Sequence, residues 1–160
     1  MVNKKIIYID MDNTLADYLK AAKEEGIDPK DAKHIKGFFR NLKHMPGAIE
    51  AYNKLSKDFD VYLLTTVPWS NPYACVEKIE WVKEYLPGAY KNVIFSHHKD
   101  LNIGDYLIDD SLFNGANKFT GEHIQIYTDK FPNWESVIKY IFAKEKMNLY
   151  LNGFTFLENM

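Results

Sequence analysis

The stretch KKIIYIDMDNTL, residues 4–15, decides the fold of this chain, because an apolar run ends there at two carboxylates. A run rich in Ile and Tyr that stops at a turn-prone Asn is typical of a central parallel strand. In open α/β sheets, ligands bind beyond the carboxyl ends of such strands. Asp10 and Asp12 are therefore expected at a functional site. The alternative interpretation is that one of them only caps the helix that follows.

A second acidic pair favours the functional interpretation. The segment DYLIDD, residues 105–110, is another short apolar run, and it ends in Asp109 and Asp110. Carboxylates gathered at one edge of a sheet repel one another unless a cation neutralises them. Hard oxygen ligands favour Mg²⁺, which shares its coordination shell with substrate phosphate. The two pairs together predict a Mg²⁺ site for phosphoryl chemistry.

Two further strand ends lie between the acidic pairs. Residues 60–66 end in two threonines, and residues 92–96 are followed closely by Lys99. A hydroxyl and an ammonium group can both donate to phosphate oxygens. Each signal is weak alone, because Thr is common in strands and Lys is usually solvated. The specific signal is their order along the chain.

This order resembles the four motifs of the haloacid dehalogenase-like phosphohydrolases: acid-x-acid, then Thr, then Lys, then a final acidic pair. The resemblance implies that Asp10 attacks phosphorus and that Asp12 acts as general acid and base. It also implies Mg²⁺ ligation by the Asp10 side chain, the Asp12 backbone carbonyl and the terminal pair, Asp110 with Asp109 in support.

Four shorter phrases narrow the resemblance to the 5'(3')-deoxyribonucleotidase family, whose members remove phosphate from nucleoside monophosphates. The resemblance covers residues 4–142, and the phrases occur in the family's order at residues 38–42, 46–51, 77–82 and 107–110. It implies a phosphoric monoester hydrolase of the 5'-nucleotidase type.

Phosphate contacts follow from the same resemblance. Thr65 and Lys99 fall where the phosphoryl group is held, with Thr66 beside them. His97 stands where the family usually carries Arg, which would weaken a contact to phosphate. Asn13 replaces the usual Gly, and this change is tolerable because Asn also adopts left-handed backbone geometry.

Substrate choice is expected to come from a short cap inserted after the first strand, residues 16–45, which is smaller than the cap of the mammalian members. Tyr18, Phe38 and Phe39 are candidates to stack on a nucleobase, and by the resemblance Tyr18 falls where an aromatic residue contacts the base. The alternative for the two Phe residues is core packing. His97 is a candidate contact for phosphate or for the cap.

Alternating strand and helix patterns predict an α/β fold, a three-layer Rossmann-like parallel sheet with helices on both faces and a short helical cap. The resemblance supplies the strand order 3-2-1-4-5. Helices are expected at residues 14–25, 46–57, 72–86 and 133–146, and a fifth strand at residues 123–127.

The chain is expected to form one domain over residues 1–160, since 46% hydrophobic and 15% aromatic residues are too apolar for disorder. The tail, residues 148–160, is apolar but aperiodic. We expect it to pack on the body or on a partner subunit, which leaves a homodimer open.

Charge and cysteine content limit the possible partners of the chain and its expected cellular location. A net charge of −2 gives no electrostatic footprint for duplex nucleic acid or an anionic membrane. A small phosphorylated substrate such as a nucleoside monophosphate fits better. Cys75 is the single cysteine, and no signal peptide or long apolar span is present, so a reducing cytoplasm is the expected location.

Two rival functions stay open. The same motifs with another cap would suit a different small phosphate ester or a nucleic-acid 3'-phosphate. A non-catalytic binding module that keeps the fold is less favoured, because every acid of the four motifs is present.

Overall fold

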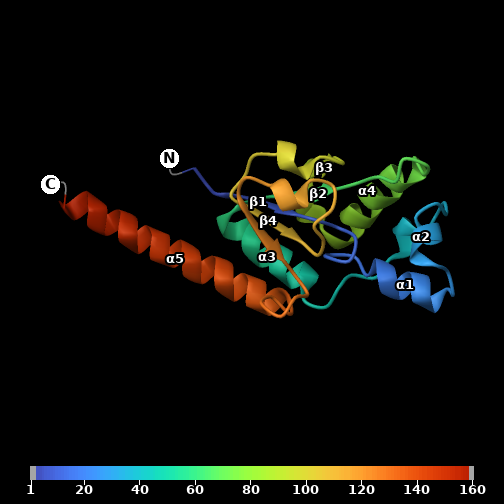
Figure 1. The fold of residues 1–160 in the computed structure, drawn as a ribbon, viewed down its shortest axis with the longest axis horizontal. Coiled ribbons are helices and arrows are strands. Elements are labelled where there is room, and N and C mark those ends of the chain that lie inside the picture. The colour runs from blue at the N-terminus through green and yellow to red at the C-terminus, as the bar shows by residue number, and fades with distance from the viewer. Residues whose placement is uncertain (1–2, 159–160) are drawn as a thin grey trace.

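The computed structural model describes residues 3–158 and contains one sheet of five parallel strands (Figure 1). The strand order is β3-β2-β1-β4-β5, which confirms the predicted order. The strands are β1 (Ile6–Ile9), β2 (Asp60–Thr65), β3 (Val93–Phe95), β4 (Tyr106–Asp109) and β5 (Glu122–Gln125). Ile7 of β1 is paired with Val61 of β2 on one side and with Tyr106 of β4 on the other. The strands that carry the two acidic pairs are therefore neighbours.

Helices and tight turns connect the strands. The α-helices are α1 (Tyr18–Glu24), α2 (Pro29–Ala32), α3 (Ala48–Asp58), α4 (Tyr73–Tyr85) and α5 (Trp134–Glu158). Short 3-10 turns are η1 (Phe39–Asn41), η2 (Pro87–Ala89), η3 (Lys99–Leu101) and η4 (Ala116–Lys118). The predicted cap therefore consists of α1, α2 and η1.

The two faces of the sheet are covered unequally. Ile7 and Ile9 of β1 join the large core that also contains residues of α3, α4 and α5. Tyr8 points to the other face and packs in a small cluster with Leu107 of β4 and Ala116 of η4. Helices were predicted on both faces, but the second face carries 3-10 turns, because its connections, residues 96–105 and 110–121, are short.

The first cap helix begins later than predicted. Residues 11–16 form a tight turn in which the Leu15 and Ala16 amides both donate to the Met11 carbonyl, at 2.8 and 2.9 Å. Asn13 adopts a φ of 59° in this turn, which is a conformation that Asn tolerates. The helix then starts at Tyr18 with Asp17 as its N-cap. The turn keeps residues 10–14 at the sheet edge rather than in a helix.

The last helix is longer than predicted. It was expected to end at Lys146, but it continues to Glu158, and its C-terminal half projects beyond the sheet (Figure 1). Among the α5 side chains that the structure describes, which end at residue 151, the buried ones lie in the first half, with Val137 and Ile141 fully buried. The sequence signal failed because the apolar residues of the second half follow no helical period.

The expected packing of residues 148–160 on the body or on a partner stays a prediction. From residue 152 onward it concerns side chains outside those that the structure describes. Within the described part of the chain, no helix has both the length and the apolar character needed to cross a membrane.

Candidate active site

Three carboxylates meet at the carboxyl edge of the two central strands. Asp10 directly follows β1, its amide donates to the Ile108 carbonyl of β4 at 2.9 Å, and Asp109 and Asp110 lie at the end of β4. Side-chain oxygens of the three acids all lie within 4.8 Å of one another. The strand pairing thus brings together acids that are about one hundred residues apart in sequence.

A buried lysine neutralises part of this charge. Lys99 Nζ lies 2.8 Å from Asp10 Oδ1 and 2.5 Å from Asp109 Oδ2, and the lysine is only 3% exposed. Its backbone is fixed because the Lys99 amide donates to the Asn114 carbonyl at 2.8 Å. Burial alone would lower the pKa of Lys99, but the charges of Asp10 and Asp109 raise it above its usual value. Lys99 is therefore a permanent cation beside the predicted nucleophile.

The remaining negative charge suits a divalent cation. Burial and the Asp10 charge raise the pKa of Asp109 to about 6 and that of Asp110 to about 7. Thr14 Oγ1 lies 3.1 Å from Asp110 Oδ1 and accepts from the Asp110 amide at 3.2 Å, which fixes that carboxylate. Crowded carboxylate oxygens of this kind are ligands for a hard ion. The residues present therefore fit a site for a divalent metal ion.

Asp12 is held by a second buried lysine, Lys78 of α4. Lys78 Nζ donates to Asp12 Oδ2 at 2.7 Å, to Thr65 Oγ1 at 2.9 Å and to the Thr66 carbonyl at 2.8 Å. Asp12 Oδ1 is buried and has no hydrogen-bond partner among the described residues. Burial raises the pKa of Asp12, Lys78 opposes this, and the Asp10 charge adds to it. Such a carboxyl is suited to carry a proton near neutrality.

Lys78 was missed by the sequence analysis, although a signal for it exists. It lies on the α4 face that includes the buried Ala74, Trp81 and Val82, at helical spacings of three and four residues. A lysine on a buried face needs an anionic partner. Helical periodicity therefore marks Lys78 as paired, but it does not identify Asp12 as its partner.

A cleft of about 600 Å³ opens beside Asp12, between the cap and the carboxyl edge of the sheet. Of the predicted substrate residues, four line it: Tyr18, Phe39, Thr66 and His97. Thr65 is fully buried with its hydroxyl on Lys78 rather than on the cleft wall. Cleft residues that the sequence analysis did not assign to substrate binding include Asn13, Lys30, Lys33, His34, Trp69, Ser70 and Asn114.

The three predicted cap aromatics pack on one another and join the large core. Ring centroids lie 5.2 Å apart for Tyr18 and Phe38 and 5.7 Å apart for Tyr18 and Phe39. Phe38 is 5% exposed and does not line the cleft, which agrees with the core alternative for this residue. The Tyr18 hydroxyl donates to the Pro29 carbonyl at 2.5 Å, so this side chain also braces α1 against α2.

Two buried polar residues fasten the cap to the body. Glu77 of α4 accepts from the Gly37 amide at 2.6 Å and from the Phe39 amide at 3.1 Å. Asn71 Nδ2 donates to the Lys33 carbonyl at 3.0 Å. Both side chains are 2% exposed. The cap is therefore tied to the loop and helix that follow β2, and one wall of the cleft has a fixed position.

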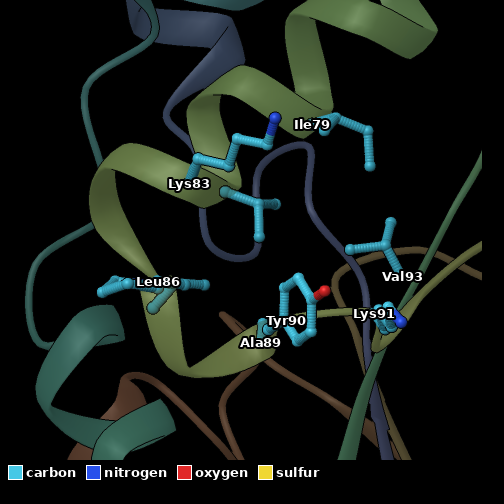
Figure 2. A pocket seen from close by; sticks show the side chains of 9 residues that line it. Ile79, Lys83, Leu86, Ala89, Tyr90, Lys91 and Val93 are labelled. Carbon is cyan, nitrogen blue, oxygen red and sulfur yellow. The ribbon is translucent and has the colours of Figure 1, made fainter.

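A second hollow, of about 300 Å³, lies between α4, η2 and the edge strand β3 (Figure 2). Its lining is mainly apolar and includes Val82, Leu86 and Tyr90. None of the predicted site residues lines it. The predicted site residues that line a hollow therefore line the first cleft and not this one.

The fold is that of the haloacid dehalogenase-like hydrolases. A HAD-hydrolase from Bacillus subtilis, solved bound to magnesium, superimposes with a TM-score of 0.52 at 13% identity, covering 82% of this chain and 90% of that one. A haloacid dehalogenase-like family protein from Streptococcus pneumoniae gives a TM-score of 0.52 at 18% identity, covering 88% of this chain and 92% of that one.

Sequence comparison narrows this class to one family. The model of the "5' nucleotidase, deoxy (Pyrimidine), cytosolic type C protein" family matches residues 32–141. A Vibrio phage KVP40 protein named as a 5'(3')-deoxyribonucleotidase is 47% identical over 150 residues, covering 90% of this chain and 88% of its own length. A Staphylococcus epidermidis protein of the same name is 31% identical, covering 91% of this chain and all of its own.

The chain belongs to this deoxyribonucleotidase family and is a phosphoric monoester hydrolase of the 5'-nucleotidase type.

Proposed function

We propose that the protein hydrolyses deoxynucleoside monophosphates with Mg²⁺ through a phosphoenzyme on Asp10. The observation that carries the proposal is the buried group formed by Asp10, Asp109, Asp110 and Lys99, with Asp12 at the adjoining cleft. Family membership supports the substrate class, because the relatives are named as 5'(3')-deoxyribonucleotidases. The expected location is a reducing cytoplasm, on the basis of the single Cys75.

The nucleophile in this proposal is Asp10. Its carboxylate attacks phosphorus in line with the nucleoside oxygen, the P–O bond to that oxygen breaks, and the phosphoryl group remains on Asp10. Lys99 places a positive charge 2.8 Å from Asp10 Oδ1, which reduces repulsion between the carboxylate and the phosphate dianion. Mg²⁺ bound by Asp10, Asp109, Asp110 and the Asp12 carbonyl would add further neutralisation of the same charge.

Asp12 moves the protons in both half-reactions. In the first it gives a proton to the departing nucleoside oxygen, and in the second it takes a proton from the water that attacks the phosphoenzyme. Lys78 leaves one Asp12 oxygen, Oδ1, available for this transfer, because it engages only Oδ2.

Phosphate and base contacts are assigned from the walls of the cleft. Thr66 and His97 line the same cleft as Asp12 and are assigned to the phosphoryl oxygens. Thr65 and Lys99 are buried next to this part of the site and are assigned to the same phosphoryl group. Tyr18 and Phe39 line the cleft on the cap side. Phe38 packs against those two rings within the core.

A turnover screen tests the proposal. Deoxynucleoside monophosphates should be hydrolysed in Mg²⁺ and not in a chelator, and faster than sugar phosphates or an oligonucleotide 3'-phosphate. Preference for either of the latter two would replace the nucleotidase proposal with one of its rivals. No turnover of any phosphate ester in Mg²⁺ would contradict the catalytic mechanism.

A further inference from the structure

Trp69 is a large apolar side chain that the fold does not bury. It is 95% exposed, whereas the other two tryptophans, Trp81 and Trp134, are 1% and 2% exposed. It lies in the loop between β2 and α4 and lines the cleft beside Asp12. An indole gains stability when it is buried, so its exposure at this cleft points to a ligand rather than to the core.

The backbone that carries Trp69 is fixed on both sides. The Asn71 amide donates to the Pro68 carbonyl at 2.9 Å and closes a tight turn with Trp69 at its first corner. Asn71 also ties this turn to the cap through the Lys33 carbonyl, at 3.0 Å. Ser70 contacts the His34 ring. The backbone at Trp69 therefore has a fixed position between the cap and the body. This lowers the conformational entropy that is lost when a ligand binds the indole.

The position of Trp69 suits the far end of a nucleotide. It follows Thr66 by three residues, so their Cα atoms lie at most about 11 Å apart. Thr66 and Asp12 line the same cleft as Trp69, and in the proposed mechanism the departing nucleoside oxygen of the substrate must lie at Asp12. The base of that substrate would then extend along the cleft towards the indole.

The cap aromatics leave less ring surface free. Tyr18, Phe38 and Phe39 are 8%, 5% and 1% exposed, because they pack on one another. Trp69 in contrast offers a ring face that no described residue covers to any extent. Of the aromatic residues at this cleft, it can give a base the most stacking area.

We infer that Trp69 is a substrate-binding residue that stacks on the nucleobase and closes the base site from the body side, opposite Tyr18 and Phe39. The inference rests on the proposed function. Because every base offers a ring face, this contact favours nucleotides over sugar phosphates without selecting strongly among bases.

Steady-state kinetics of Trp69→Ala and Trp69→Phe test the inference. Stacking of about 1–3 kcal/mol predicts a loss in kcat/KM of about 5- to 150-fold for deoxynucleoside monophosphates in the Ala variant, mainly through KM. Deoxyribose 5-phosphate, which has no base, should be unaffected, and Phe should restore most of the loss. Tyr90→Ala is the matched control, since Tyr90 is 76% exposed and lines the other hollow.

Fluorescence gives a readout that does not depend on turnover. Iodide quenches exposed indoles, so in this chain it reports on Trp69 rather than on the two buried tryptophans. In the Asp10→Asn variant with Mg²⁺, a deoxynucleoside monophosphate should protect Trp69 from iodide, and deoxyribose 5-phosphate should not.

The outcomes separate the two proposals. Nucleotide turnover with unchanged kinetics in Trp69→Ala and no protection from iodide would overturn the role of Trp69 alone. Equal losses for the nucleotide and for deoxyribose 5-phosphate would also overturn it, because the residue would then support the phosphate site. Hydrolysis of sugar phosphates but not of nucleotides by the wild-type protein would overturn the proposed function and this inference together.

Discussion

The acidic site and the cleft beside it are built in opposite ways. Asp10, Asp109, Lys99 and Lys78 are 7%, 0%, 3% and 1% exposed and bind one another or their neighbours. The outer cleft is lined by exposed side chains such as Lys33, His34 and Trp69. In the proposed mechanism the reactive groups are thus positioned before substrate arrives, whereas the side chains proposed to recognise it are exposed at the cleft. Variants on the two sides should therefore fail differently.

The largest effect is expected at Asp10. Asp10→Asn removes the nucleophile while keeping the shape of the side chain, so kcat should fall by about 10⁴-fold or more. Thermal unfolding of the variant should still be cooperative, because Lys99 retains Asp109 as a partner. Substantial Mg²⁺-dependent turnover by this variant would mean that another group attacks phosphorus.

Asp12→Asn should lower kcat by about 10²- to 10⁴-fold, the usual contribution of a general acid and base. Substrate and metal binding should persist, since the backbone carbonyl is unchanged. Equilibrium binding of a nucleotide to the variant measures this directly. Asn13→Gly, which restores the residue usual in the family, is the neighbouring control and should keep near wild-type turnover. If binding falls in proportion to rate, Asp12 is mainly structural.

Mg²⁺ should stabilise the folded protein. Ligand at 100 times its Kd adds about 2.7 kcal/mol to the free energy of unfolding, which corresponds to about 5–10 °C in Tm for a chain of this size. Asp110→Asn should reduce this shift, and Asp129→Asn, at an exposed position, should not. Differential scanning fluorimetry with and without Mg²⁺ provides the comparison. An undiminished shift in Asp110→Asn would remove that residue from the metal site.

Lys78→Met tests the coupling between the two regions with a smaller effect. Removing one partner of a buried ion pair costs about 3–5 kcal/mol, but the Asp12 side chain is 27% exposed, so we expect a loss of about 2 kcal/mol. Lys78 holds the pKa of Asp12 down, so its removal should raise that pKa. Asp12 would then stay protonated to higher pH, and the alkaline limb of the pH profile of kcat should shift to higher pH.

Lys83→Met is the matched control, because Lys83 is exposed on the same helix. It should change neither the unfolding free energy nor the pH profile appreciably. A pH profile that is the same in Lys78→Met and in the wild type would show that Lys78 does not set the protonation of Asp12.

The sequence allowed prediction of the site residues that lie at or just after strand ends. Asp10, Asp109 and Lys99 were found because parallel strands deliver their carboxyl ends to one edge, and the structure brings these three side chains together. Lys78 and Glu77 were not found, because their partners lie 66 and about 40 residues away and become neighbours only when α4 packs on the cap and on the turn after β1. Pairing across such distances leaves no local pattern.

Helix boundaries and the residues of the cleft wall were harder to predict from the sequence. The α1 start depends on the left-handed Asn13 turn, and the C-terminal half of α5 has no helical period to read. Trp69 gives no signal in sequence, because an exposed and a buried Trp look alike until the turn at residues 68–71 is known.

The central claim is that Asp10 takes the phosphoryl group, and trapping that group tests it most directly. Enzyme mixed with a ³²P-labelled deoxynucleoside monophosphate in Mg²⁺ is quenched in acid within one turnover, and the labelled peptide is sequenced. We predict label on Asp10 in the wild-type protein and none in Asp10→Asn. Label on a different residue, or turnover that continues in Asp10→Asn, would contradict the account.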